Sequence, residues 1–174
     1  MAVSYRDELA AAQTVGRVGE VVRHATRRLT QADGATFVLR DGELCFYADE
    51  DAIGPLWKGQ RFPMTECISG WAMLHREAVA VPDIELDPRI PLDAYRPTFV
   101  RSLVMVPIND AEPVGAIGAY WARPAVASAE RASTLTELAG AAAAAIERIG
   151  LDTAPWAPNF RVPGGSARRE LQRD

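Results

Sequence analysis

RSLVMVPINDAEPVGAIGAY, residues 101–120, predicts two apolar strands joined by a polar turn. β-Branched and aromatic side chains are concentrated in residues 103–108 and 114–121, and the stretch 109–113 between them is rich in turn-forming residues. Because both strands are apolar at nearly every position, both faces of the sheet that contains them must be covered. We expect helices to cover one face of this sheet and a different kind of structure to cover the other face.

Length and composition predict one domain with one sizeable core. The chain has 174 residues, 48% of them hydrophobic. Its formal net charge is -4, with both signs mixed along the chain, so we expect no nucleic-acid partner. The sequence has no secretory signal pattern and no apolar run of membrane-spanning length, which favours a cytoplasmic protein without a membrane partner. Cys45 and Cys67 are too few for a disulfide framework and lack metal-ligand spacing.

Two long helices are predicted near the ends of the chain. Residues 5–31 carry apolar side chains at three- and four-residue spacing, and a single helix of that length would measure roughly 40 Å. Since a small core does not require such a length, we expect part of this helix to pack outside its own domain. Ser128 is suited to cap a second helix that ends at Gly150. That helix is apolar nearly all round, which favours burial against the sheet and a partner helix.

Shorter elements are predicted between these helices. Asp41-Gly42 suits a tight hairpin between strands at 38–40 and 44–47. We also expect a helical turn at 53–57 and a short strand at 60–62.

The next part of the chain predicts a helix, a strand and a connection. Thr65 is suited to cap a helix at 66–76, and residues 78–81 predict a strand. The connection at 82–97 contains four prolines, which exclude a continuous helix or strand. Residues 150–174 are rich in Pro, Gly and Arg without a sustained period, and we interpret them as a flexible tail or linker.

Three sequence phrases, in this order of elements, resemble the GAF domain family, small sensory modules found beside histidine kinases, cyclic-nucleotide enzymes and photoreceptors. The phrases are GQRFPMTECISGWAM (59–73), AVAVPDIELDPRI (78–90) and RSLVMVPINDAEPVGAIGAYW (101–121). The resemblance covers residues 5–149. It implies an α+β, GAF-like (profilin-like) fold: a central antiparallel sheet of five to six strands with the N- and C-terminal helices on one face. Short helices and a loop-rich lid would cover a pocket on the other face, and the terminal helices would pair in a homodimer.

The residues themselves also predict a pocket. The segment 83–99 carries Tyr95 and Phe99, so it must fold over something apolar, which is the uncovered face of the sheet. Aromatic residues on the preceding short elements would border the same space, where a small molecule could bind. The candidate ligand-binding residues are Trp57, Phe62, Cys67, Trp71, Asp83, Tyr95, Phe99 and Arg101.

Each candidate also has a structural interpretation. The aromatic residues are more often core than ligand contacts, and a free cysteine such as Cys67 is more often buried than reactive. The carboxylate of Asp83 suits capping of loop amides as well as contact with a ligand. Arg101 could bind a carboxylate or phosphate, or form an ion pair with Asp83 or Asp93.

The resemblance also bears on catalysis and cofactors. Some family members reduce free methionine sulfoxide with pocket cysteines, but the family cysteine beside the helix glycine falls at Ser69, before Gly70, which disfavours sulfoxide or peroxide chemistry. Photoreceptor relatives attach a bilin through a cysteine that often neighbours a histidine. Neither His24 nor His75 has a neighbouring cysteine, so we expect no covalent bilin, and no other cofactor is indicated.

The sequence therefore predicts a non-enzymatic sensory module that binds an unidentified small molecule or partner and signals through dimerised terminal helices. Its output would be a histidine kinase or another signalling protein. Two alternatives stay open: a degenerate module that serves only in dimerisation or protein interaction, and a small thiol-dependent redox enzyme that would require an acidic thiol at Cys67.

Overall fold

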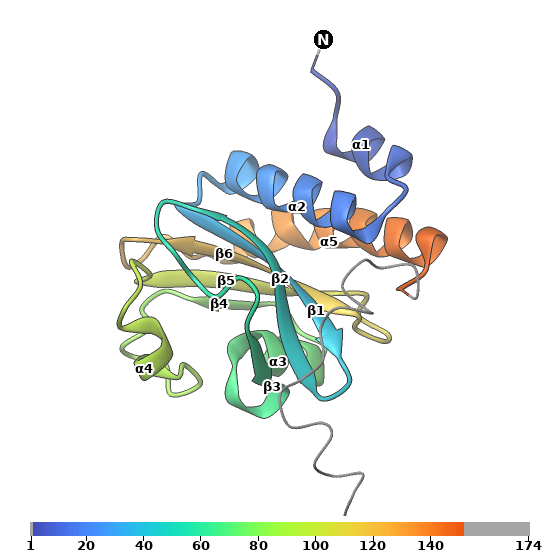
Figure 1. Ribbon diagram of the computed structural model, residues 1–174. Helices are drawn as coiled ribbons and strands as arrows, with labels where there is room; N and C mark the ends of the chain where they lie inside the picture. Colours follow the sequence, from blue (N-terminus) through green and yellow to red (C-terminus); the bar gives the residue numbers. More distant parts are fainter. Residues whose placement is uncertain (1, 152–174) are drawn as a thin grey trace, which may run out of the picture.

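A single antiparallel sheet organises the computed structural model, which describes residues 2–151 (Figure 1). Its six strands follow the order β3-β2-β1-β6-β5-β4, with every neighbouring pair antiparallel. The strands are β1 (Gly34–Asp41), β2 (Leu44–Ala52), β3 (Arg61–Pro63), β4 (Val79–Val81), β5 (Ser102–Ile108) and β6 (Gly115–Trp121). The α+β architecture with a central antiparallel sheet is confirmed, and the two strands predicted from residues 101–121 lie inside the sheet as β5 and β6.

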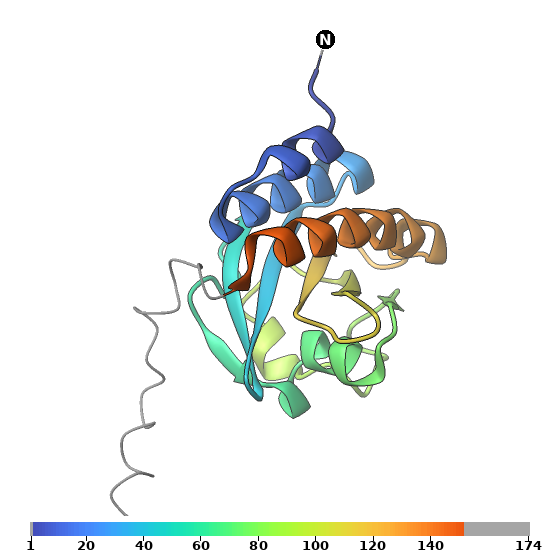
Figure 2. The same cartoon turned by 90° about the vertical axis from the view of Figure 1, so that its right-hand side faces the viewer.

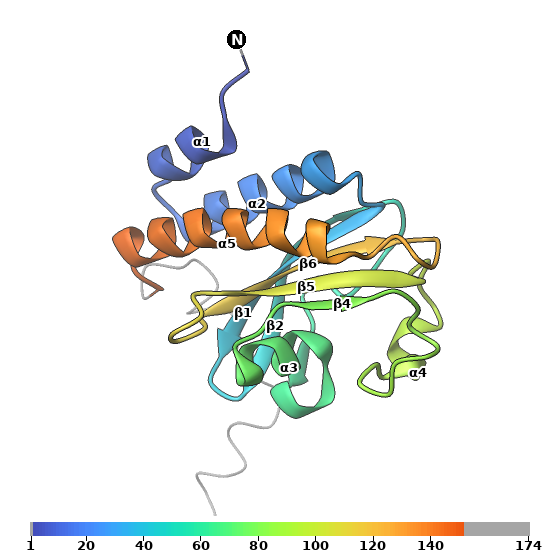
Figure 3. The same cartoon turned by 180° about the vertical axis from the view of Figure 1, so that it is seen from behind.

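Different layers cover the two faces of the sheet. Helices α2 (Val15–Thr30) and α5 (Ala129–Ile149) lie side by side on one face, and α1 (Tyr5–Ala11) packs beside them (Figures 1 and 2). The short helices α3 (Ile68–His75) and α4 (Leu92–Tyr95) lie on the opposite side, as the rear view also shows (Figure 3). A 3₁₀ turn, η1 (Met64–Glu66), precedes α3.

The alternation of side chains along the inner strands explains why both faces are apolar. On β5, Val104 and Val106 belong to the core beneath the long helices, whereas Leu103 and Met105 belong to the core on the opposite face. Successive side chains of a strand point to opposite faces, so a strand buried on both sides must be apolar at every position.

The predicted single helix at 5–31 is wrong. The chain leaves the helix at Ala12, whose backbone is extended, and α2 begins after Thr14, whose hydroxyl oxygen accepts the N–H of Arg17 at 3.1 Å. A threonine that caps a new helix offers its backbone an alternative to continuing the old one. Consequently α1 turns back onto its own domain, where Leu9 is only 1% exposed, so the surplus length is not free to pack outside it.

One arginine holds this turn in place from the other end of the chain. The Nη2 of Arg148, in the last turn of α5, donates to the backbone carbonyls of Leu9 at 3.0 Å and Ala12 at 2.8 Å. The Leu9 carbonyl also accepts the backbone N–H of Ala12 at 3.2 Å, and both carbonyls lie at the C-terminal end of α1, where helix carbonyls need partners from outside the helix. The two ends of the helical layer are therefore joined directly.

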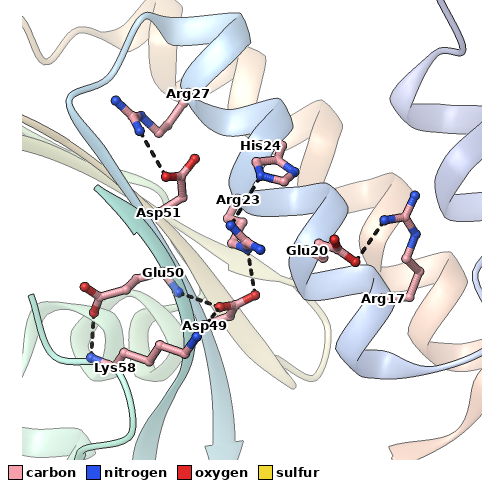
Figure 4. A network of polar contacts seen from close by, with 9 residues as sticks. All are labelled: Arg17, Glu20, Arg23, His24, Arg27, Asp49, Glu50, Asp51 and Lys58. Carbon is pink, nitrogen blue, oxygen red and sulfur yellow. Dashed lines mark hydrogen bonds and ion pairs between the residues drawn. The ribbon is translucent and has the colours of Figure 1, made fainter. Parts of the chain in front are cut away.

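Ion pairs join the helical layer to the outer part of the sheet (Figure 4). Arg23 Nε lies 2.8 Å from an Asp49 carboxylate oxygen, and Arg27 Nη1 lies 3.0 Å from an Asp51 carboxylate oxygen. Both arginines lie on α2 and both aspartates on β2. The alternating aspartates therefore point to the helical side of this strand.

Residues 53–58 form a non-helical loop rather than the predicted helical turn. The carboxylate of Glu50 accepts the backbone N–H of Leu56 at 3.0 Å and that of Lys58 at 2.6 Å, and Figure 4 shows the second of these bonds. Charge-assisted bonds to backbone amides satisfy groups that a helix would otherwise have paired. Glu50 thus fixes the loop that carries Trp57.

A further prediction needs correction. Thr65 does not cap the short helix: it lies inside η1, and the capping position of α3 belongs to Cys67. The proline-rich connection forms no continuous helix, as predicted, but it contains the one-turn helix α4 between Pro91 and Pro97, which lie just outside its ends. Proline is compatible with a helix boundary, so the prolines limit this helix to one turn without preventing it.

No helix within residues 2–151 combines the length and the apolarity needed to cross a lipid bilayer. Most of the predicted C-terminal tail lies outside the described residues.

Candidate functional site

A cavity of about 510 Å³ lies on the face of the sheet opposite the long helices. Its wall is formed by β2, the loop at 53–58, β3, η1, the start of α3, and the lid at 88–95. The lining residues are Tyr47, Trp57, Phe62, Thr65, Glu66, Cys67, Pro88, Arg89, Ile90, Pro91, Asp93, Ala94 and Tyr95. A cavity of this size with several aromatic side chains and few charged groups in its wall is typical of a small-molecule site.

Trp57 is at the centre of the aromatic wall. Its ring meets the rings of Tyr47, Tyr95 and Tyr120 edge-on at centroid distances of 5.5, 4.8 and 5.6 Å. The indole Nε1 donates to the carbonyl of Ala94 at 3.2 Å, so the same side chain joins the loop at 53–58 to α4 in the lid. Buried indoles usually find such a partner, and the bond fixes the ring in one orientation.

The charged groups of the cavity are few and lie in its outer part. Arg89 binds the Asp87 carboxylate, and this pairing lowers the pKa of Asp87 below its ordinary value. The Arg89 guanidinium also lies over the Trp71 ring, 4.6 Å from its centroid. Arg89 is paired with Asp87 and Asp93 is paired with Arg96, so among the described residues of the lining the Glu66 carboxylate is the charge that forms no ion pair.

A cluster of hydroxyl and thiol groups lies between the cavity and the sheet. Cys67 Sγ is 3.3 Å from Ser69 Oγ and 3.4 Å from the Pro63 carbonyl oxygen, and Ser69 Oγ is 3.0 Å from the Tyr47 hydroxyl. Cys67 and Cys45 of β2 belong to the same buried cluster, and the Pro63 carbonyl next to the Cys67 sulfur belongs to the residue after Phe62, the strand partner of Cys45. Cys67 belongs to the cavity wall, whereas Cys45 is completely buried and is not part of that wall.

These contacts shift the pKa values of the two thiols in opposite directions. Interaction with the Cys45 thiol lowers the pKa of Cys67 to about 7; burial opposes this shift, and bonds from Ser69 and the Gly70 backbone N–H add to it. The same interaction, together with burial, raises the pKa of Cys45 far above its ordinary value. At neutral pH the thiol at the cavity is therefore the one that ionises.

We expect the alkylation of Cys67 by iodoacetamide to follow this pKa. Because the thiolate is the nucleophile and the folded-state pKa is lowered, the rate should be half-maximal near pH 7 and fall at more acidic pH, whereas an ordinary thiol has its midpoint near about 8.5. Mass spectrometry of the native protein measures this rate. Cys67→Ala should abolish labelling, since Cys45 is buried, and a wild-type midpoint at or above pH 8.5 would contradict the assignment.

Four of the eight sequence-predicted residues lie together in the wall: Trp57, Phe62, Cys67 and Tyr95. Their contact with a ligand stays a prediction.

The other four lie elsewhere. Trp71 stacks on His75 with centroids 4.1 Å apart, and Asp83 accepts the Glu85 backbone N–H at 3.0 Å, which is the capping role weighed above. Phe99 packs beside Gly34, on the first residue of β1.

Arg101 borders a second hollow of about 380 Å³, and Tyr95 is a wall of both. Among the described residues Arg101 pairs with neither Asp83 nor Asp93: the latter binds Arg96 at 2.8 Å. The Arg101 Nε is buried without a hydrogen-bond partner.

The sequence interpretation missed several lining residues. They are Tyr47, Thr65, Glu66, Pro88, Arg89, Ile90, Pro91, Asp93 and Ala94. One signal could have found Tyr47: it lies two positions from Cys45 on the same strand, so both side chains must point to the same face. The lid residues gave no such signal, because loops have no fixed period.

The comparisons agree with this architecture. The family model of the GAF domain matches residues 12–147, so the chain belongs to the GAF domain family. No curated protein matches the chain. Among residues 2–151 there is no group of three His, Cys, Asp or Glu side chains that could hold a metal ion.

Several solved structures share the fold. The free methionine-R-sulfoxide reductase of Neisseria meningitidis, solved with its substrate, has a TM-score of 0.72 at 20% identity, covering 83% of this chain and 85% of that one. The GAF domain of the Acinetobacter phosphoenolpyruvate-protein phosphotransferase has 0.71 at 14%, covering 83% and 89%. The GAF-B domain of DevS from Mycobacterium smegmatis has 0.64 at 18%, covering 91% and 99%. At these identities the likeness extends to the fold alone.

Proposed function

We propose that this GAF domain is a non-catalytic sensory module that binds a small molecule in the cavity centred on Trp57. The observation that carries the proposal is the cavity itself, about 510 Å³ with Tyr47, Trp57, Phe62 and Tyr95 in its wall. Such a wall favours a ligand with a planar apolar body. The Glu66 carboxylate, which forms no ion pair among the described residues, favours a neutral or cationic molecule over an anion.

We propose further that two copies pair through their helical layers and pass ligand occupancy to a signalling output such as a histidine kinase. The outward side of α5 supports this arrangement, because Gly140 and Ala144 are exposed there and leave room for close approach of a second helix. Occupancy can change the output only if the two states of the module bind the ligand with different affinity.

Native mass spectrometry tests both parts, since it detects a retained small molecule and counts subunits in one measurement. Candidate ligands are then added in thermal unfolding assays, with aromatic amines compared with aromatic carboxylates of the same size. A ligand at 100 times its Kd stabilises the folded state by about 2.7 kcal/mol. For a domain of this length that corresponds to roughly 5–11 °C in Tm.

A cavity-filling variant localises the effect. Ala94→Phe places a ring in the cavity and should abolish the ligand-induced rise in Tm, whereas Ala111→Phe, in the exposed turn before β6, should retain it. If no tested compound or metabolite extract raises the Tm and no molecule is retained, a ligand-free interaction module becomes the better account.

The redox-enzyme alternative is tested separately. Ser69, at the position where the family resemblance puts a catalytic cysteine, is buried and bonded to Tyr47 and Cys67, so no thiol is available there. Incubation with free methionine-R-sulfoxide and a dithiol reductant should therefore give no sustained turnover. Turnover that Cys67→Ala abolishes would overturn the non-catalytic assignment.

A further inference from the structure

The fold brings the two cysteines of the chain together although 21 residues separate them in the sequence. On the edge of the sheet, Cys45 of β2 is paired with Phe62 of β3. The chain then turns through η1 and returns to Cys67 at the start of α3, where the Cys67 sulfur lies 3.4 Å from the carbonyl oxygen of Pro63, the residue after Phe62. Sequence spacing alone gave no indication of this contact.

The two thiols differ in their access to the cavity, and this difference determines which of them reacts first with a reagent. Cys67 is 9% exposed and lines the cavity, so a small reagent in the cavity can reach its sulfur. Cys45 is 0% exposed and is not part of the cavity wall. A reagent therefore meets Cys67 first, and Cys45 can react only with whatever forms on Cys67.

We propose that Cys67 is a site of reversible oxidation by small hydroperoxides and that Cys45 is its resolving thiol. The Cys67 thiolate attacks the terminal oxygen of the hydroperoxide: an S–O bond forms, the O–O bond breaks, and its electron pair leaves with the second oxygen, which takes a proton to give water or an alcohol. Sulfur is oxidised by two electrons and Cys67 becomes a sulfenic acid.

The second step closes a disulfide. The Cys45 sulfur attacks the Cys67 sulfur, the S–S bond forms, the S–O bond breaks, and the hydroxyl leaves as water with the proton of Cys45. A dithiol reductant returns both residues to thiols. Since both side chains belong to one buried cluster at the junction of β2, β3 and α3, the Cys45 thiol is the nucleophile available to the sulfenic acid.

This proposal goes beyond ligand binding, although it concerns a residue of the same cavity wall. A disulfide would draw the start of α3 towards β2, and it would remove an ionisable group from the cavity. Oxidation should therefore alter ligand binding, and a bound ligand should protect Cys67 from the hydroperoxide. The protein would then respond to two chemical signals at one site.

The test treats the reduced native protein with one equivalent of hydrogen peroxide and reads the intact mass under non-reducing conditions. The wild type should lose two hydrogen atoms and both alkylatable thiols, and dithiothreitol should restore them. Cys45→Ala should instead gain one oxygen and be labelled by dimedone, a reagent for sulfenic acids. Cys67→Ala should remain unmodified at the same peroxide concentration.

Circular dichroism and thermal unfolding establish that each variant is folded, and Cys45→Ser provides a second replacement if Cys45→Ala is not. The proposal is overturned if the wild type gains oxygen without losing two hydrogens, if the disulfide forms between chains on a non-reducing gel, or if Cys67→Ala is oxidised as fast as the wild type. Because no ligand is added, these results do not depend on whether the cavity binds one.

Discussion

Replacing Gly70 with alanine is expected to destabilise the protein by about 3 kcal/mol or more, which for a domain of this length lowers the Tm by roughly 6–12 °C. A Cβ at this position would overlap the backbone of Met64, including its carbonyl group. Backbone atoms cannot move aside as a flexible side chain can, so η1 and the start of α3 would have to separate. Thermal unfolding followed by circular dichroism measures the change.

Gly16→Ala is the matched control, since it makes the same chemical change in another helix, α2. A Cβ at Gly16 would meet only the Thr14 hydroxyl oxygen, at an ordinary contact distance of 3.9 Å, and alanine favours a helix over glycine by about 0.5–1 kcal/mol. This variant should therefore be unchanged or slightly stabilised. A Gly70→Ala protein as stable as Gly16→Ala would show that η1 and α3 are not packed as described.

Trp57→Ala should have the second large effect, a loss of about 3–5 kcal/mol in the free energy of unfolding, because truncating a buried tryptophan leaves a cavity. Trp57 is 5% exposed and its removal also leaves the Ala94 carbonyl without the indole N–H. Trp57→Phe retains most of the ring area and should lose less, about 1–2 kcal/mol, chiefly from the broken hydrogen bond. Urea denaturation measures both changes.

Trp71→Ala is the control that separates the effect of removing Trp57 from the general cost of removing a tryptophan side chain. Trp71 is only partly buried and stacks on His75 outside the cavity, so the cost should be clearly smaller than for Trp57→Ala. Trp57→Ala should also speed the alkylation of Cys67, because the lid at 88–95 loses its attachment. Equal costs for the two tryptophans, with no change in alkylation, would refute the claim that Trp57 holds the lid.

The sheet could be predicted from the sequence because its signals are periodic and local. The hairpin at Asp41-Gly42 and the apolar runs that became β5 and β6 each combine strand composition with turn residues at defined positions. The break in the first helix was missed because apolar spacing continues through it, and only the capping ability of Thr14 indicated an end.

The cavity wall was predicted only in part, for a physical reason. Helix α3 is apolar on most of its surface, so periodicity cannot select which of its residues points into a pocket, and Trp71 lies against His75 and under Arg89 rather than in the wall. The path of the segment 82–99 depends on contacts such as the bond between Trp57 and Ala94, which join residues far apart in the sequence. Contacts of that kind have no local signature.

The middle of β2 has a mechanical consequence. Asp49 and Asp51 hold α2, while Glu50, between them, holds the loop that carries Trp57. Three consecutive residues of β2 thus bind α2 and the loop at 53–58 at the same point of the strand. We therefore expect a sideways displacement of the Trp57 indole to act directly on the backbone of β2 that binds α2, without any intervening element.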